Sequence, residues 1–317
     1  MWSDFTNNAF KRIKKKKYNN SFINKIKCIR SDIKKIKDVE YKINIIKINN
    51  NIINNLKSSE WVSKKLSYDY LLYEINITWN NNNNNIYIKT TEEKFNNFKH
   101  RIPIFLKIIN YINKDNDKIN IYLILSNLKK YVNVDEIISP DHVNSGYCDV
   151  VNKYIFIWRE EEFEKVCFHE IIHLINHDHR HEEIDLNTNI DGDESYYEAI
   201  TDFKAIIYNL IYLSLITKIK LSLLFSYEYF FIKNQSYYIY NVLKVSNKQN
   251  TPAYSYFILK KNIFKYFNYE FNELLFNDIF FKNINYYVLI NIIKDYINKD
   301  KQFIDFNSAR MTLFELK

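Results

Sequence analysis

Residues 167–180 carry the pattern His-Glu-x-x-His at His169, Glu170 and His173. Two histidines four residues apart project from the same face of a helix, so both imidazoles can reach one metal ion. The glutamate beside the first histidine then faces a water on that metal rather than the metal itself. The pattern therefore predicts a helix that carries a Zn2+ site, with Glu170 as general base.

A catalytic zinc site keeps three protein ligands, so a further ligand is needed. Glu198 can supply it from a second helix, and Asp202, one turn later, can accept the outer N–H of a liganding histidine. This Glu-x-x-x-Asp arrangement resembles the gluzincin peptidases. The alternative third ligand is His179, six residues after His173 as in metzincins. Because metzincins also need a methionine turn beneath the metal and the only internal methionine is Met311, we favour Glu198.

Residues 187–198 also match the ligand spacing of an EF-hand calcium loop, with Gly192 at the turn. Asn187 replaces the usual first aspartate, however, and Glu194 occupies a position that is normally apolar. We interpret this stretch as an acidic loop that enters a helix. Five of the seven histidines lie in residues 169–181, and this crowding favours a metal site over histidines packed in a core.

Periodicity predicts an α+β fold, and the resemblance to gluzincins implies that it is zincin-like, with a small mixed sheet packed on the active-site helix. We expect strands at residues 74–79, 86–90, 118–125, 147–151 and 154–158, the last two as a hairpin. The metal-binding helix should begin near Glu160. A mostly helical part follows, with helices expected at residues 194–217, 234–245, 253–267, 270–282 and 286–297.

The predicted organisation has two parts. Residues 1–95 form a basic N-terminal arm and a poorly defined region, in which residues 31–56 read as helical. Residues 96–317 form the metallopeptidase-like domain, with strands and the active-site helix to about residue 182 and a helical subdomain over 193–317. The apolar stretch 205–232 contains Lys218, Lys220 and Glu228, which favours a buried core helix over a transmembrane segment.

Charge and cysteine usage indicate the setting. Residues 1–37 hold twelve Lys or Arg against two Asp, mostly in the run from Lys11 to Lys17. Such a run contacts nucleic acid or an anionic surface, or is simply a solvated charge run. Three scattered cysteines do not make a disulfide framework, and the N-terminus lacks a signal-peptide pattern. We expect an intracellular, reducing compartment rather than secretion.

The chain resembles the zinc metallopeptidases encoded by large DNA viruses of the mimivirus and poxvirus-like type. The residues that carry this resemblance beyond the zinc motif are Asn144-Ser145-Gly146-Tyr147, Ile157-Trp158-Arg159-Glu160-Glu161, Lys165-Val166, Glu194-Ser195-Tyr196 with Glu198, and Arg310-Met311-Thr312. It covers the chain from about residue 95 onward and leaves the basic arm outside. It implies Glu198 rather than His179 as ligand, and a location in the host cytoplasm or the virion.

These observations predict a zinc-dependent peptidase that acts on a protein or peptide substrate. Glu170 would take a proton from water and deliver it to the leaving amine. Tyr196, Tyr197, a later tyrosine or Arg310 would stabilise the oxyanion, and the sequence does not choose among them. The alternative is a non-catalytic, zinc-stabilised viral structural protein or a nucleic-acid-associated protein.

Overall fold

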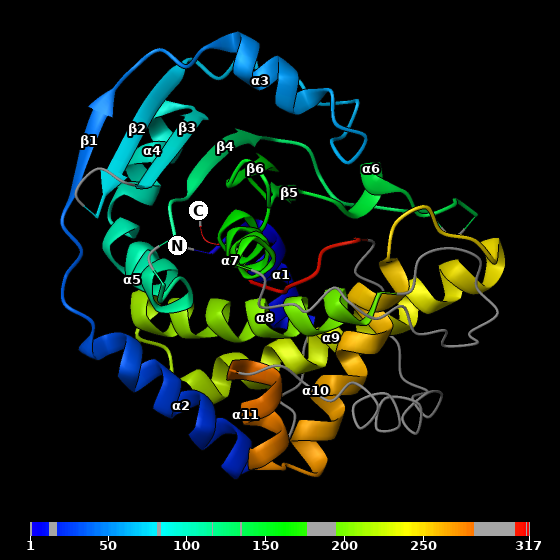
Figure 1. Ribbon diagram of the computed structural model, residues 1–317. Helices are drawn as coiled ribbons and strands as arrows, with labels where there is room; N and C mark the ends of the chain where they lie inside the picture. Colours follow the sequence, from blue (N-terminus) through cyan, green and yellow to red (C-terminus); the bar gives the residue numbers. More distant parts are fainter. Residues whose placement is uncertain are drawn as a thin grey trace.

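A mixed six-stranded sheet with helices packed on it organises the chain (Figure 1). The computed structural model describes residues 2–12, 18–80, 84–115, 117–133, 135–175, 195–281, 308–314 and 316. Within these ranges the fold class is α+β, as the sequence predicted.

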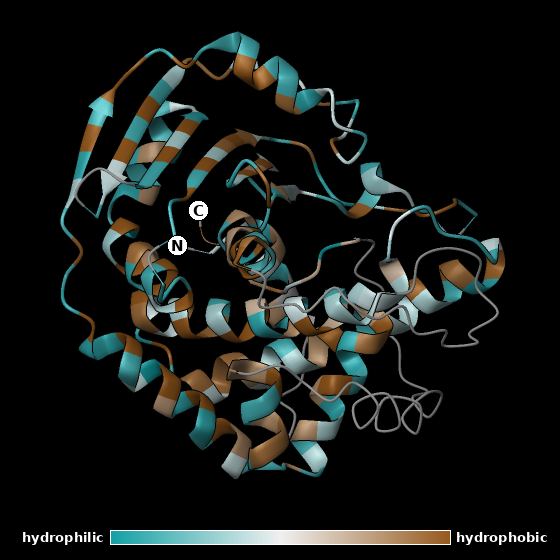
Figure 2. Ribbon diagram, viewed as in Figure 1, coloured by the Kyte–Doolittle hydropathy of each residue, from teal (hydrophilic) through white to brown (hydrophobic). Residues whose placement is uncertain are grey.

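The sheet has the strand order β1-β2-β3-β4-β6-β5. Its strands are β1 (Tyr41–Ile45), β2 (Tyr73–Trp79), β3 (Asn84–Thr90), β4 (Asn120–Ser126), β5 (Gly146–Asp149) and β6 (Tyr154–Arg159). The first three pair antiparallel, β3, β4 and β6 are parallel, and β5 pairs antiparallel with β6 at one edge. Brown and teal bands alternate along β1, β2 and β4 in Figure 2, the period-two pattern of strands with one buried face.

The helices fall before, between and after the strands. They are α1 (Asp4–Arg12), α2 (Asn20–Lys35), α3 (Asn50–Lys57), α4 (Glu92–Lys99), α5 (Ile102–Ile112), α6 (Pro140–Val143), α7 (Phe163–Leu174), α8 (Tyr196–Thr217), α9 (Leu221–Ser246), the π-helical turn η1 (Ser255–Leu259), α10 (Lys260–Tyr269) and α11 (Glu273–Phe281). The crossover from β3 through α4 and α5 to β4 makes those two strands parallel.

The predicted strands and the hairpin are present, with every end within two residues of its expected position. The helical interpretation of residues 31–56 was wrong, because α2 ends at Lys35 and this stretch also contains β1 and α3. The side chain of Asn49 caps the N-terminus of α3 by accepting a hydrogen bond from the amide of Asn51 at 2.9 Å. Because isoleucines recur at mixed spacings in this stretch, its sequence did not separate the end of α2 from β1 and α3.

The boundary near residue 95 does not interrupt the sheet. β2 and β3 precede it, β4 and β6 follow it, and β3 pairs directly with β4. The segment after the basic run also belongs to the fold, because Phe22, Ile26 and Ile33 of α2 are buried in the main core with α5, α8 and α9. Residues 13–17 lie outside the described residues, so the structure gives no account of that run.

The C-terminal half is helical, as predicted. α9 starts at Leu221, thirteen residues before the predicted start. Its first half continues the apolar composition of α8, so the sequence did not show where this helix begins. The predicted helix at 286–297 lies outside the described residues. α8 is long and apolar enough to cross a membrane, but 89% of its most apolar window is buried in the fold. Burial in the core therefore accounts for its composition.

α7 lies at the centre, between the sheet and α8 (Figure 1). The opposite face of the sheet is covered by α3 and the segment after it, where Leu56 and Leu66 pack against Phe156 and Trp158. A C-terminal segment, residues 308–314, runs buried beside α7 and α8. The hydroxyl of Thr6 in α1 donates to the carbonyl of Leu313 at 3.0 Å, which ties the start of the chain to this segment.

Candidate metal centre

The metal-binding pattern lies on a helix that is buried on all sides. α7 follows β6 after a short turn in which Glu162 adopts φ of 62°. The helix begins at Phe163, not at Glu160 as predicted. The glutamates before and within its first turn form ion pairs, such as Glu164 with Arg101 at 2.7 Å. Their carboxylates are therefore held by cations of the core and do not simply complement the helix dipole.

His169 and His173 project from one face of α7, and their ring centroids are 4.6 Å apart. Glu198, in the first turn of α8, meets them from the neighbouring helix. Its Oε2 lies 3.2 Å from Nε2 of each histidine, and the two Nε2 atoms lie 2.9 Å from each other. We call these three residues the His-His-Glu triad; among the described residues they form the one group suited to hold a metal ion.

The separations within the triad fit a tetrahedral zinc site. Zinc binds imidazole nitrogen and carboxylate oxygen at about 2.0–2.1 Å, so two ligand atoms on a tetrahedron lie roughly 3.3 Å apart. The observed separations of 2.9, 3.2 and 3.2 Å are close to this value. Within the described part of the chain the converging donors are two imidazoles and one carboxylate, and three protein ligands of these kinds together with a water make up a catalytic zinc site.

Asp202 lies one turn after Glu198 and contacts the outer nitrogen of the first histidine. Its Oδ1 is 3.1 Å from Nδ1 of His169, and its side chain is fully buried. An acceptor at Nδ1 favours the tautomer whose Nε2 lone pair points toward the triad. Burial, with the nearby His173, lowers the pKa of His169 to about 3. The imidazole is therefore neutral at pH 7, as a metal ligand must be.

Glu170 sits beside the triad without belonging to it. Its carboxylate packs against the backbone of β5 at Gly146, where an added Cβ would lie 3.1 Å from Oε1 of Glu170 and 2.8 Å from Val166. Glycine at this position therefore leaves room for the carboxylate. Glu170 lines the same cleft as the triad, so it can reach a molecule bound there without displacing a ligand.

A cleft of about 590 Å³ opens onto the triad. One wall is β5, from Gly146 to Asp149, and the opposite wall is the end of α3 with the segment that carries Trp61. Tyr197 and Tyr256 complete the lining beside the ligands. Part of the region before residue 95 thus contributes to the candidate site, which the sequence did not indicate.

Tyr256 is the functional candidate that the sequence did not single out. It lies on η1, its ring is 6.0 Å from that of His169, and its hydroxyl donates a hydrogen bond to Glu198. Burial, together with the carboxylates of Glu198 and Glu170, raises the pKa of Tyr256 well above its usual value, so it stays a protonated donor. No local pattern distinguishes it among 27 tyrosines.

The other predicted oxyanion donors are placed differently. Tyr197 lines the cleft, with its ring 6.1 Å from that of His173. Tyr196 is buried in the main core. Arg310 is also buried, and its guanidinium pairs with the core carboxylate of Glu161 at 2.8 Å. This candidate donor is therefore already engaged by another residue.

Several residues that the sequence raised lie outside the described residues. These are His177, His179, His181 and Glu194, with most of the calcium-like loop around Gly192. Met311, in contrast, is far from the motif in sequence but close to it in space, with its sulfur 3.5 Å from Nζ of Lys165. Met311 therefore lies beside the metal-binding helix although the two are far apart in sequence.

Comparison of the chain with protein-family models, with curated proteins and with solved structures found no match.

Proposed function

We propose that the protein is a zinc-dependent peptidase with a zincin-like, gluzincin-type fold. One observation carries the proposal. Two imidazole nitrogens and one carboxylate oxygen from two helices converge within 3.2 Å of one another on the floor of a cleft, with Glu170 beside them. A zinc site that only stabilises a fold is closed by a fourth protein ligand, whereas an open cleft beside three ligands favours catalysis.

In this proposal His169, His173 and Glu198 hold the metal. When bound, zinc supplies Lewis acidity, which lowers the pKa of water and polarises a carbonyl. The carboxylate of Glu170 accepts a proton from the attacking water and passes it to the nitrogen of the leaving amine. Asp202 keeps the Nε2 lone pair of His169 directed at the triad.

Tyr256 is our candidate for the oxyanion donor. It reaches the triad from η1 and keeps its proton at neutral pH. Its hydroxyl donates to Glu198 in the structure, and by turning from Glu198 toward the cleft it can donate a hydrogen bond to the carbonyl oxygen as negative charge develops there. A π-helical turn is a frequent local irregularity at functional sites, which supports this assignment.

The cleft favours an extended polypeptide as substrate. β5 is an edge strand of the described sheet and lines the cleft along its length. An extended peptide can pair with the backbone groups of such an edge, and side-chain pockets then add specificity. The resemblance to metallopeptidases of large DNA viruses supports the same function. That kinship, the intracellular location and a nucleic-acid or anionic-surface role for Lys11–Lys17 stay predictions.

Metal analysis combined with a peptide-library cleavage assay tests the proposal. We expect the wild type to bind one zinc ion and to cleave peptides. Glu170→Gln should keep the zinc and lose cleavage, because the amide cannot accept the proton. Glu198→Ala should lose the zinc. Glu160→Gln is the matched control: it makes the same chemical change just before α7 at a carboxylate that pairs with Lys94 instead.

Two results would contradict the proposal. Unchanged cleavage by Glu170→Gln would remove the general-base mechanism. Bound zinc in a wild type that cleaves no peptide would favour the alternative, a zinc ion that only stabilises the helix pair. Loss of cleavage in Glu160→Gln would show that the assay responds to general damage at the start of the helix.

A further inference from the structure

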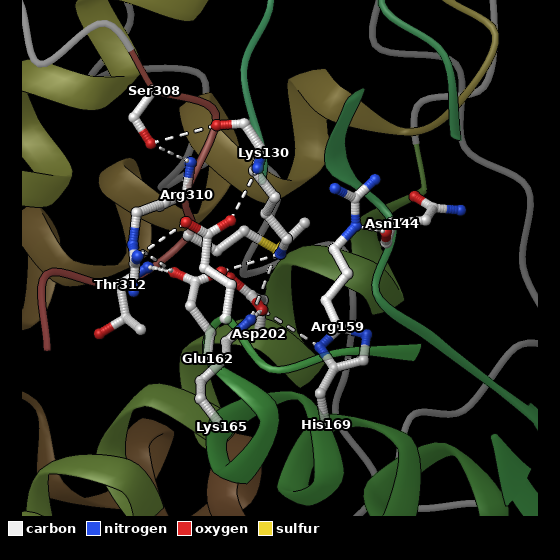
Figure 3. Close-up of polar contacts among 12 residues, drawn as sticks. Lys130, Asn144, Arg159, Glu162, Lys165, His169, Asp202, Ser308, Arg310 and Thr312 are labelled. Atoms are coloured by element: carbon white, nitrogen blue, oxygen red, sulfur yellow. Dashed lines mark hydrogen bonds and ion pairs between the residues drawn. The ribbon is translucent and has the colours of Figure 1, made fainter. Parts of the chain in front are cut away.

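Beneath the triad, charged side chains form a buried cluster (Figure 3). Four carboxylates and four cations contribute to it, and all are at most 6% exposed. We call this set the ionic cluster; it consists of Glu161, Glu162, Asp202, Glu228, Lys130, Lys165, Lys260 and Arg310. It joins α7, α8, α9 and α10 to the C-terminal segment. Asp202 is the member that also contacts the triad.

The carboxylate of Asp202 is held at both oxygens. Oδ1 contacts the ammonium of Lys165 and Nδ1 of His169, the latter at 3.1 Å. Oδ2 contacts the ammonium of Lys260 at 2.6 Å. Orienting a histidine requires only one acceptor oxygen, so the second contact fixes the rotation of the carboxylate about its own bond.

The two lysines are held in turn by Met311. Its carbonyl accepts a hydrogen bond from Lys260 at 3.1 Å, and its sulfur lies 3.5 Å from the ammonium of Lys165. The residues on either side anchor this position. Thr312 donates its amide to Glu162 at 2.6 Å, and Arg310 pairs with Glu161 at 2.8 Å. The C-terminal segment therefore sets the position of both ammonium groups.

Stability alone gives little reason for this arrangement. Removing an ammonium group from water costs several kcal/mol, and one lysine is enough to neutralise one buried carboxylate. Burial lowers the pKa of both lysines, that of Lys260 to about 7, so keeping two ammonium groups on Asp202 is itself unfavourable. Fixing the orientation of the His169 imidazole offsets the free-energy cost of burying the two lysines, because a metal ligand has to be held in one rotamer and one tautomer.

We propose that Lys165 and Lys260 are positioning residues of the metal centre. Together they clamp Asp202, which holds His169 for the metal, and Met311 fixes the clamp from the C-terminal segment. The proposal rests on the metal binding in the proposed function and does not depend on peptidase activity. It assigns a role in the metal centre to residues that are distant in sequence. Lys260 follows Lys165 by 95 positions, and Met311 follows it by 146.

Zinc affinity of the full chain tests the clamp. We expect Lys260→Met to raise the zinc Kd about 10- to 100-fold, the usual effect of losing a partner behind a metal ligand. The visible absorption of the Co2+-loaded protein should change as well, because the orientation of His169 changes. Competition with a chromophoric chelator measures the Kd, and near-UV circular dichroism confirms that the variant is folded.

Lys130→Met is the matched control. Lys130 is as buried as Lys260 and pairs with Glu162 at 2.8 Å, but it does not contact Asp202. The control should lose stability while its folded form keeps the wild-type zinc Kd and Co2+ spectrum. A structural effect common to all buried lysines would instead change both variants alike, which would overturn the proposal.

Lys260→Gln serves if methionine at this position does not fold. Its amide stays polar but stops one bond short of the ammonium position, so it cannot hold Asp202 and the Met311 carbonyl together, and we expect the same loss of affinity. Wild-type Kd and Co2+ spectrum in a folded Lys260 variant overturn the clamp alone. A wild type that binds no zinc overturns the proposed function, and the clamp with it.

Discussion

The His-His-Glu triad and the ionic cluster are both buried and polar, and they share helix α7, yet their chemistry differs. In the ionic cluster cations and carboxylates are matched, for example Lys130 with Glu162 and Arg310 with Glu161. In the triad three electron-pair donors face one point. A matched set contributes to folding, whereas a set of converging donors is completed by a cation from outside. Burial of charge alone therefore does not identify a functional site.

Breaking the matched set should give the largest effect on stability. We expect Glu162→Gln to lower the free energy of unfolding by about 3–5 kcal/mol, because Lys130 is left buried without a counter-charge. Urea denaturation followed by circular dichroism measures this. Glutamine keeps an oxygen that can accept from the amide of Thr312, so the anchor of Met311 remains and the zinc Kd of the folded variant should stay unchanged. A stable variant with weakened zinc binding would contradict the division of roles.

His173→Leu should have the opposite effect. If three ligands share a zinc-binding free energy of about 10–16 kcal/mol equally, each carries about 3–5 kcal/mol, so we expect the zinc Kd to rise by roughly 10²–10⁴-fold. The metal-free protein should unfold at nearly the wild-type urea concentration, because leucine is similar in size to histidine and Glu198 keeps its contacts with His169 and Tyr256. Large destabilisation without metal would show that the triad also acts as a structural cluster.

The pH dependence of stability should follow the ionic cluster. Burial alone would raise the pKa of Glu162, but attraction to Lys130 and Arg310 outweighs it and lowers this pKa from 4.5 to about 2. The unfolded chain then binds more protons than the folded one between these values. The contribution of Glu162 is therefore complete above pH 4.5 and is lost as the pH falls toward 2.

This loss should amount to about 3 kcal/mol, from 1.36 kcal/mol per pKa unit. Urea midpoints of the wild type between pH 6 and 3 should show about 2 kcal/mol of this loss, because the rest occurs between pH 3 and 2. Glu162→Gln removes the titrating group, so its pH dependence over the same range should be flatter. Parallel curves for the two proteins would assign the acid sensitivity to other groups.

Gly146→Ala should produce the smallest effect, on turnover alone. The added Cβ would meet Val166 and the carboxylate of Glu170, which displaces the general base by a few tenths of an ångström. We expect kcat to fall about tenfold while zinc affinity stays unchanged. Ser145→Ala is the control on the neighbouring residue, since it adds no atom. Equal losses in both variants would point to damage in β5 rather than displacement of Glu170.

The convergence of the three side chains of the His-His-Glu triad could be predicted because metal chemistry needs fixed spacing on helices. His169 and His173 are one turn apart, and Glu198 and Asp202 repeat that spacing on the next helix, so local sequence carries the pattern. The strands were recognisable for the same reason, since period-two alternation is local.

The remaining parts depend on contacts between distant segments. Tyr256 reaches the cleft through a π-helical turn, and Lys260 and Met311 reach Asp202 from elements that meet only in the folded chain. The glutamates at the start of α7 pair with Arg101, Lys130 and Arg310, and nothing nearby in sequence shows that these cations will meet them. Pairing of this kind follows from topology.

The contact of Thr6 with Leu313 spans 307 positions, and that of Lys165 with Met311 spans 146. During translation α7 and α10, which carry Lys165 and Lys260, leave the ribosome before the C-terminal segment that contacts these lysines. The sheet and both helices that carry the triad are thus synthesised while Lys165 and Lys260 still lack Met311. Closing such long loops is slow and entropically costly. The centre therefore reaches its final form among the last steps of folding, after synthesis has passed residue 314.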